Sequence, residues 1–455
     1  MPSTQSIATK SPTRLNSWLD SLGLGRPELR AYALYDWAKS AFETTVMAAI
    51  LPIYFHDFAA ATLPENLRTA YWGYTSGIAL LIVAILSPLL GAIADAFGTL
   101  KRMLFAFMLV GVIATALLVF VGHGDWRLAG WLYLIGTLGY AGSNVFYDAL
   151  LPIIATPDEM DRASTAGYAL GYVGGGLLLA VNLAWLTFPD TFGFSDKGQA
   201  IRASFLSVSV WWIIFAVPLW RRISERPNNR HASEVGSVLG VGFRRLLATG
   251  KQLRRYRQVL LFLIGYWFYT DGIGTIIKMA TIYGREIGIG QTHLIGALLL
   301  VQFLGIPATF AFGYLAKRTS AKLGIMISLA VYTGICVLGY FMTSAMHFWA
   351  LAVLVALVQG GAQALSRSLY ASMVPLSKVS EFFAFISVSA RFAGILGPLL
   401  FGLFAQFFGG SRLSILFLIT FFVIGMIMLM LVDVEEGQRN AAEAEADIQA
   451  QHRHA

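Results

Sequence analysis

The sequence predicts an all-α integral membrane protein with twelve transmembrane helices in two six-helix bundles. Of its 455 residues, 57% are apolar and only 13% are charged. Apolar stretches of about 20 residues, the length that crosses the hydrocarbon core as a helix rising ~1.5 Å per residue, recur along the chain. In lipid, every backbone amide must be bonded within its own segment, so these stretches are helices.

The apolar stretches place the twelve spans in order. They cover residues 31–55, 72–94, 102–122, 129–152, 165–187, 203–221, 258–284, 291–315, 323–343, 347–373, 382–406 and 412–432. The polar segments divide the chain into five units. We expect an N-terminal segment at 1–30, an N-terminal bundle at 31–221, a basic linker at 222–257, a C-terminal bundle at 258–432 and a tail at 433–455.

The net charge of +8 is explained by membrane topology rather than by nucleic-acid binding. Loops on the N-terminal side of the membrane hold 23 of the 33 Lys and Arg residues, the opposite loops hold six, and four lie within spans. Because basic residues concentrate in cytoplasmic loops, both termini and the linker are expected in the cytoplasm, with the spans in the cell (inner) membrane. The first 30 residues lack an apolar segment before a cleavage site, so the first span is expected to direct insertion.

Several kinds of chemistry find no support in the sequence. Cys336 is the only cysteine, so no internal disulfide can form. No Gly-x-x-x-x-Gly-Lys-Ser/Thr loop occurs, and the seven histidines lack metal-ligand spacing. We therefore expect no enzyme, no cofactor and no metal.

The two halves carry a faint parallel repeat. A shift of 223 residues places five residues of the fourth and fifth spans on identical residues of the tenth and eleventh: Tyr147 on Tyr370, Pro152 on Pro375, Ser164 on Ser387, Gly171 on Gly394 and Gly174 on Gly397. The linker between the halves alternates apolar and basic residues, which fits either a helix lying on anionic membrane lipids or a solvated connection.

The loop between spans two and three reads Gly91-x-x-x-Asp95-x-x-Gly98-x-x-Lys101-Arg102. It resembles the signature loop of the major facilitator superfamily, whose six-plus-six layout matches the whole chain. The loop at the same place in the second half has Lys317 where the acid would be.

Three further motifs resemble the vacuole-effluxer-like branch of that superfamily. They are Tyr35-Asp36-Trp37-Ala38-Lys39-Ser40-Ala41-Phe42, Asp271-Gly272 and Gln363-Ala364-Leu365-Ser366-Arg367-Ser368. The resemblance implies transport, since yeast members of the branch export amino acids from the vacuole, whereas most bacterial members have no assigned substrate. Lys39 stands where the family pattern has Asn, and Glu43 follows one turn later, which puts the substrate and the coupling ion in doubt.

Charged residues inside spans are informative, because each costs at least ~2.5 to 3.5 kcal/mol on insertion scales. All eight lie in spans one, four, seven, ten and eleven: Asp36, Lys39, Glu43, Asp148, Asp271, Lys278, Arg367 and Arg391. The resemblance implies that spans one, four, seven and ten line a central cavity. For each charge, a structural ion pair is as good an interpretation as a transport role.

Depth separates the interior charges into two groups. Glu43 and Asp271 lie near the middle of their spans and are candidates for substrate or proton binding, with Lys39, Tyr147, Gln363 and Tyr370 as further candidate lining residues. Asp36, Asp148, Arg367 and Arg391 lie toward the cytoplasmic ends and are candidates for a gate. Tyrosines of this kind are also common as packing residues.

The sequence therefore predicts a monomeric secondary transporter that moves a small solute by alternating access. An amino acid or a similar zwitterion is the leading substrate, on the strength of the resemblance, and protons are a candidate coupling ion. The alternatives are a drug, sugar-phosphate or lipid carrier of the same fold, or a non-transporting receptor or scaffold.

Overall fold

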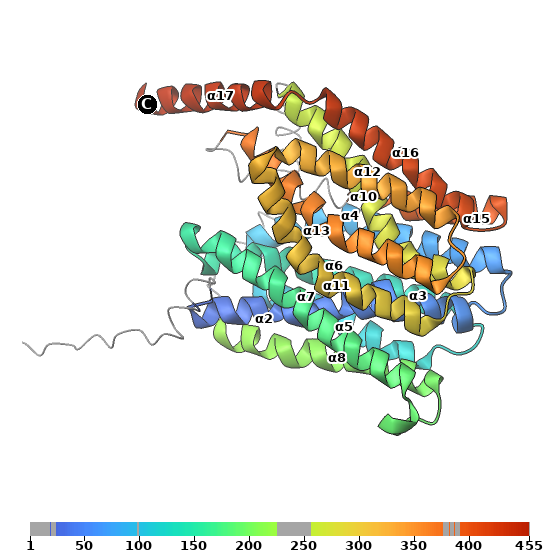
Figure 1. Cartoon of the computed structure of the whole chain (residues 1–455). Coiled ribbons are helices and arrows are strands. Elements are labelled where there is room, and N and C mark those ends of the chain that lie inside the picture. Colours follow the sequence, from blue (N-terminus) through green and yellow to red (C-terminus); the bar gives the residue numbers. More distant parts are fainter. Residues whose placement is uncertain are drawn as a thin grey trace, which may run out of the picture.

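The computed structural model describes residues 19, 24–97, 100–224, 256–375, 382, 386 and 392–454. In these ranges the chain is helical, with turns and no strand, which confirms the all-α class. Figure 1 shows the helices side by side, with the start of α2 (Pro27–Ala41) and the C-terminal helix α17 (Val434–His454) at the same end of the molecule. We name this the near end and the opposite end the far end.

The helices of the first half extend beyond the predicted apolar cores. The first span is a composite of α2, the π-helix η1 (Phe42–Ala49), α3 (Ile50–Tyr54) and the π-helix η2 (Phe55–Ala59). It is followed by α4 (Glu65–Phe97), α5 (Leu100–Leu117) with η3 (Leu118–Phe120), α6 (Trp126–Ile154), α7 (Pro157–Thr187), η4 (Asp190–Phe192) and α8 (Lys197–Arg222).

The second half repeats this pattern. Its helices are α10 (Arg257–Glu286), α11 (Gln291–Arg318), α12 (Ala321–Tyr340), α13 (Ala345–Ser372), α15 (Leu396–Phe408) and α16 (Arg412–Leu431). Within the described residues, nine helices are long and apolar enough to cross a membrane. The other three predicted spans are the composite first segment, α6 and the eleventh span, of which the structure describes the 13-residue helix α15.

Several predicted features fall outside the described residues. The linker is described only at Arg222, Ile223, Ser224, Tyr256 and Arg257, and Gly98 and Arg391 are not described. Gly91 and Asp95 lie in the last two turns of α4.

Close helix contact depends on glycine in both halves and between them. A Cβ at Gly174 of α7 would lie 2.6 Å from the Trp37 ring of α2, and one at Gly73 of α4 would lie 2.6 Å from the carbonyl oxygen of Pro398 on α15. The halves meet along two such seams, where α4 packs on α15 and α7 packs on α11. Small residues allow these backbones to approach, as in other membrane helix pairs.

Two lysines show the repeat in atomic detail. The Lys101 Nζ donates to the carbonyl oxygens of Trp220 (3.1 Å) and Ile223 (2.9 Å) at the end of α8, the last helix of its half. The Lys322 Nζ donates in the same way to Met430 (3.2 Å) and Val432 (2.7 Å) at the end of α16. Each cation thus satisfies carbonyls that have no partner within the helix and lies at the negative end of the helix dipole.

Candidate functional site

The first span changes from α-helix to π-helix at the depth where its polar residues face the interior. Because η1 bonds each amide five residues back, its carbonyls are displaced from α-helical positions, and such segments concentrate at functional sites. Here the carbonyl oxygen of Ala48 accepts a hydrogen bond of 2.8 Å from Thr281 of α10. The π-helix therefore contributes a direct contact between the halves, toward the far end from Glu43.

A cavity of about 440 Å³ lies between the halves, beside this segment. Its polar lining comes mostly from the first half, through the first span, α6 and α7, while α10, α11 and α13 close it from the second half. The lining includes five of the predicted site residues: Asp36, Lys39, Glu43, Asp148 and Gln363. The other polar lining residues are Ser40, Thr44, Tyr140, Asn144, Tyr168, Tyr172, Gln302 and Gln359, of which the sequence did not indicate Thr44, Tyr168, Tyr172 and Gln302.

Asp36 and Lys39 form a tightly packed ion pair. The Lys39 Nζ lies 3.0 Å from Asp36 Oδ1 and 4.3 Å from the centre of the Tyr147 ring. The Tyr147 hydroxyl, only 1% exposed, donates to the second Asp36 oxygen at 2.9 Å. The two charges cancel each other. Tyr147 positions the Asp36 carboxylate through its hydrogen bond and is not among the residues that line the cavity.

Glu43 has a different environment from this pair. It is exposed to the cavity and accepts one hydrogen bond, of 2.8 Å, from the Tyr140 hydroxyl of α6. No described cation lies within 4.0 Å of its carboxylate. One turn along α6, the buried Asn144 Oδ1 has no hydrogen-bond partner among the described residues.

Lys278 is the corresponding charge in the second half. Its Nζ contacts only the carbonyl oxygen of Gly274, at 3.4 Å, and makes no ion pair with a described residue. It lies close enough to Glu43 and Asp271 to interact with both electrostatically. Two opposite charges without ion-pair partners thus stand on opposite halves.

Asp271, a candidate for ion coupling, serves a local structural purpose in this conformation. It is 3% exposed, and both carboxylate oxygens accept the Gly397 amide at 3.0 Å, in the first turn of α15. A carboxylate at this position accepts a hydrogen bond from an amide that has no partner within the helix. Its negative charge also interacts favourably with the positive end of the helix dipole. A Cβ at Gly397 would lie 1.8 Å from Thr275 Oγ1, so this approach needs a glycine.

The candidate gate residues lie toward the near end. Arg367 of α13 donates to the Tyr168 hydroxyl of α7 at 3.4 Å and lies 5.4 Å from its ring centre, which bridges the two halves. Asp148 is exposed on the cavity lining and within electrostatic range of Arg367. Tyr370 is fully buried and donates to the carbonyl oxygen of Phe382, so its hydroxyl is directed away from the cavity.

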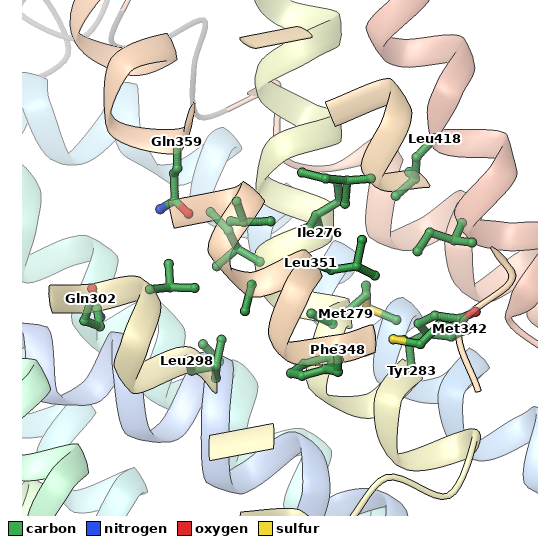
Figure 2. A pocket seen from close by; sticks show the side chains of 18 of the residues that line it. Ile276, Met279, Tyr283, Leu298, Gln302, Met342, Phe348, Leu351, Gln359 and Leu418 are labelled. Carbon is green, nitrogen blue, oxygen red and sulfur yellow. The ribbon is translucent and has the colours of Figure 1, made fainter. Parts of the chain in front are cut away.

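An apolar pocket of about 120 Å³ continues from the polar cavity into the second half. Five residues line both spaces: Thr44, Ala48, Ile277, Gln302 and Gln359. Figure 2 shows Gln302 and Gln359 at one side of the pocket and Met342 and Tyr283 at the other, with aliphatic side chains between them. The buried Gln359 Oε1 has no hydrogen-bond partner among the described residues.

The far end is held together by polar contacts that the sequence analysis missed. Arg285 Nε of α10 lies 2.7 and 2.6 Å from the two oxygens of Asp57, which lies in η2 just beyond the predicted apolar stretch 31–55. The neighbouring Glu286 accepts from Thr69 of α4 at 2.6 Å and from the Ser411 amide at 2.8 Å. The sequence did contain a signal for the Asp57–Arg285 pair. Spans one and seven are partners in the repeat, and these two residues carry opposite charges at their matching ends.

The comparisons with known proteins agree with this architecture. The chain is 37% identical over 421 residues to an uncharacterized MFS-type transporter of Bacillus subtilis, covering 92% of this chain and 97% of that protein. It is 25% identical over 431 residues to autophagy-related protein 22 of Saccharomyces cerevisiae, covering 81% and 79%.

Solved structures show the same fold at lower identity. A bacterial homologue of the human lysosomal transporter Spinster, in an inward-facing conformation, superposes with a TM-score of 0.62 at 15% identity, covering 95% of this chain and 99% of that one. A D-xylose–proton symporter gives 0.63 at 14%, covering 89% and 96%. The family model for vacuole effluxer Atg22-like proteins matches residues 65–442. The chain is therefore an MFS-type membrane transporter that belongs to the vacuole effluxer Atg22-like family.

Proposed function

We propose that this protein is a secondary transporter for amino-acid-like solutes, coupled to protons and working by alternating access. The observation that carries the proposal is the continuity between a charged cavity and an apolar pocket through five shared residues. A solute with a polar head and a short apolar side chain matches both spaces, since ligand sites are largely apolar with a few placed polar groups.

The distribution of contacts between the halves supports alternating access. At the far end, Asp57, Glu286 and their partners join the halves, whereas the cavity extends toward the near end along Asp36 and Asp148. If the termini are cytoplasmic, as the basic loops predict, this conformation is closed to the outside. A cysteine at Thr62 should then react with an impermeant reagent added outside, and one at Ser233 should not.

Glu43 and Asp271 are the two candidates for proton coupling. Glu43 is exposed to the cavity, where a solute and water can reach it, whereas Asp271 is buried against Gly397. Coupling through Glu43 would be direct, and coupling through Asp271 would act on the start of α15. Glu43→Gln and Asp271→Asn should therefore be compared for uptake as a function of pH.

Counterflow into proteoliposomes tests the substrate class. Vesicles loaded with an unlabelled amino acid should accumulate the labelled one transiently, and drugs or sugar phosphates should not compete. Competition by a drug, sugar phosphate or lipid would favour the alternative carriers. If the well-folded protein exchanges no amino acid in the panel, the proposed amino-acid-like substrate is wrong. We expect a monomer surrounded by membrane lipids in these assays.

A further inference from the structure

Two described interior charges of opposite sign, one on each half, make no ion pair and only a single hydrogen bond each. Asp36 and Lys39 neutralise each other at 3.0 Å, Asp271 is bound by the Gly397 amide, and Arg367 contacts Tyr168. Among the described residues, Glu43 and Lys278 have no ion-pair partner. A charge without an ion pair inside a membrane span is costly, which makes both residues candidates for binding a ligand.

The surroundings of Glu43 suit a cationic group. Its carboxylate accepts a hydrogen bond from Tyr140, and Asn144, whose Oδ1 has no partner among the described residues, follows one turn along α6; all three residues line the cavity. An ammonium group donates three hydrogen bonds and accepts none, so oxygens on three neighbouring lining residues match its needs. The orphaned amide oxygen is a second observation, independent of the charge, that points to a donor on the ligand.

On the other half, the surroundings of Lys278 suit an anionic group. Its ammonium group is half-buried and bonded only to one carbonyl at 3.4 Å, which leaves two of its three donors unused. In this conformation Lys278 is not among the residues that line either space, but it lies within electrostatic range of Glu43, which lines the cavity, and its neighbour Ile277 lines both spaces.

We propose that Glu43, with Tyr140 and Asn144, binds the ammonium group of the solute and that Lys278 binds its carboxylate. The proposal rests on the proposed amino-acid-like substrate and assigns its recognition to one charge on each half. A zwitterion bridges the halves and neutralises both charges when the cavity closes. In a closed site, a simple amine would leave Lys278 without a counter-charge and a simple acid would leave Glu43 without one, and both cases are unfavourable.

The test compares three solutes of nearly the same shape: L-leucine, 3-methylbutylamine, which lacks the carboxylate, and 4-methylpentanoate, which lacks the ammonium group. Binding is measured on the purified full-length protein in detergent, where passive permeation of the amine and acid plays no part. We expect the wild type to bind leucine at least 10-fold more tightly than either analogue.

The substitutions should shift this selectivity in opposite directions. Lys278→Gln should lower the affinity for leucine at least 10-fold while the affinity for 3-methylbutylamine stays the same or rises. Glu43→Gln should also lower the affinity for leucine at least 10-fold, but here the affinity for 4-methylpentanoate should stay the same or rise. Lys278→Arg and Glu43→Asp should retain part of the selectivity and control for folding. A structural ion pair would instead lower the affinity for all three solutes together.

The possible failures are distinguishable. Leucine counterflow by the wild type reports on the proposed function, and its absence would overturn the substrate class and this assignment with it. If the wild type exchanges leucine but both neutral variants keep the wild-type order of affinities, the assignment of Glu43 and Lys278 is wrong and the function stands. Equal losses for all three solutes, with Lys278→Arg and Glu43→Asp also inactive, would likewise contradict it.

Discussion

The guanidinium of Arg285 joins both oxygens of the Asp57 carboxylate, at 2.7 and 2.6 Å, and so connects the first span of one half to the first span of the other. The two side chains are about one-third exposed, at 33% and 32%, so solvent weakens the pair. Pairs of this kind contribute about 0.5 to 1 kcal/mol, which corresponds to a roughly two- to five-fold shift between two conformations.

Neutralising this pair should shift the transporter away from the conformation closed at the far end. For Asp57→Asn we expect a longer and broader distance distribution between spin labels at the exposed positions Thr191 and Met346. The Asp57→Arg, Arg285→Asp exchange should restore part of the short distance. Arg68→Gln is the matched control, because Arg68 bonds only carbonyls of its own half. An unchanged distribution in Asp57→Asn would show that the pair does not hold the far end closed.

The same contact predicts a pH dependence with a defined sign. Burial opposes ionisation of Asp57, but hydrogen bonds from His56 and Arg285 outweigh it and hold the pKa of the carboxyl below its usual value. A carboxyl with a lowered pKa contributes its stabilisation above its ordinary value of about 3.9 and loses it as the pH falls through the lowered value. Because His56 supplies one of the bonds that lower this pKa, the dependence is measured with His56 in place: closure should be constant from pH 8 to pH 5 and weaken below about pH 4. The same loss below about pH 4 in Asp57→Asn would contradict the assignment to Asp57.

The contact between α2 and α7 predicts a large effect of one added methyl group. In Gly174→Ala the new Cβ would lie 2.6 Å from the Trp37 ring and 2.7 Å from its carbonyl oxygen, and a backbone atom cannot move aside cheaply. We expect a loss of about 1 to 3 kcal/mol and a lower melting temperature in detergent. Gly334→Ala is the control, because nothing lies within 4 Å of its Cβ, so alanine there should be neutral or stabilising by up to about 1 kcal/mol. Equal melting temperatures for the two variants would refute the close packing.

We still predict that Asp148 and Arg367 form a gate at the near end. They come from opposite halves, on α6 and α13, and are within electrostatic range in the present conformation, where Arg367 contacts Tyr168. Arg367→Gln should remove a contact needed only when the near end closes, and so favour the open form while expression stays near normal. Spin labels at the exposed Ser224 and Ser372 measure this distance. The Asp148→Arg, Arg367→Asp exchange should recover part of the activity, and loss of folded protein in the single variants would indicate a structural role instead.

The sequence by itself determined the all-α membrane fold, and it predicts the division into two halves and the depth of each interior charge. These properties follow from local rules: a span needs a continuous apolar stretch, its backbone must be bonded internally, and basic residues stay in the cytoplasm. The helical spacing of Asp36, Lys39 and Glu43 also predicted that all three would face one direction, and all three line the cavity.

Only the tertiary structure decided which charges have partners. Lys39 pairs with Asp36, one turn earlier on α2, whereas Glu43 lies beyond the change to π-helix at Phe42 and accepts from Tyr140 of α6 instead. Asp271 binds an amide 126 residues away, and Asp57 binds an arginine 228 residues away. No periodicity in the chain encodes such pairs, because they depend on how the helices rotate and cross once they meet.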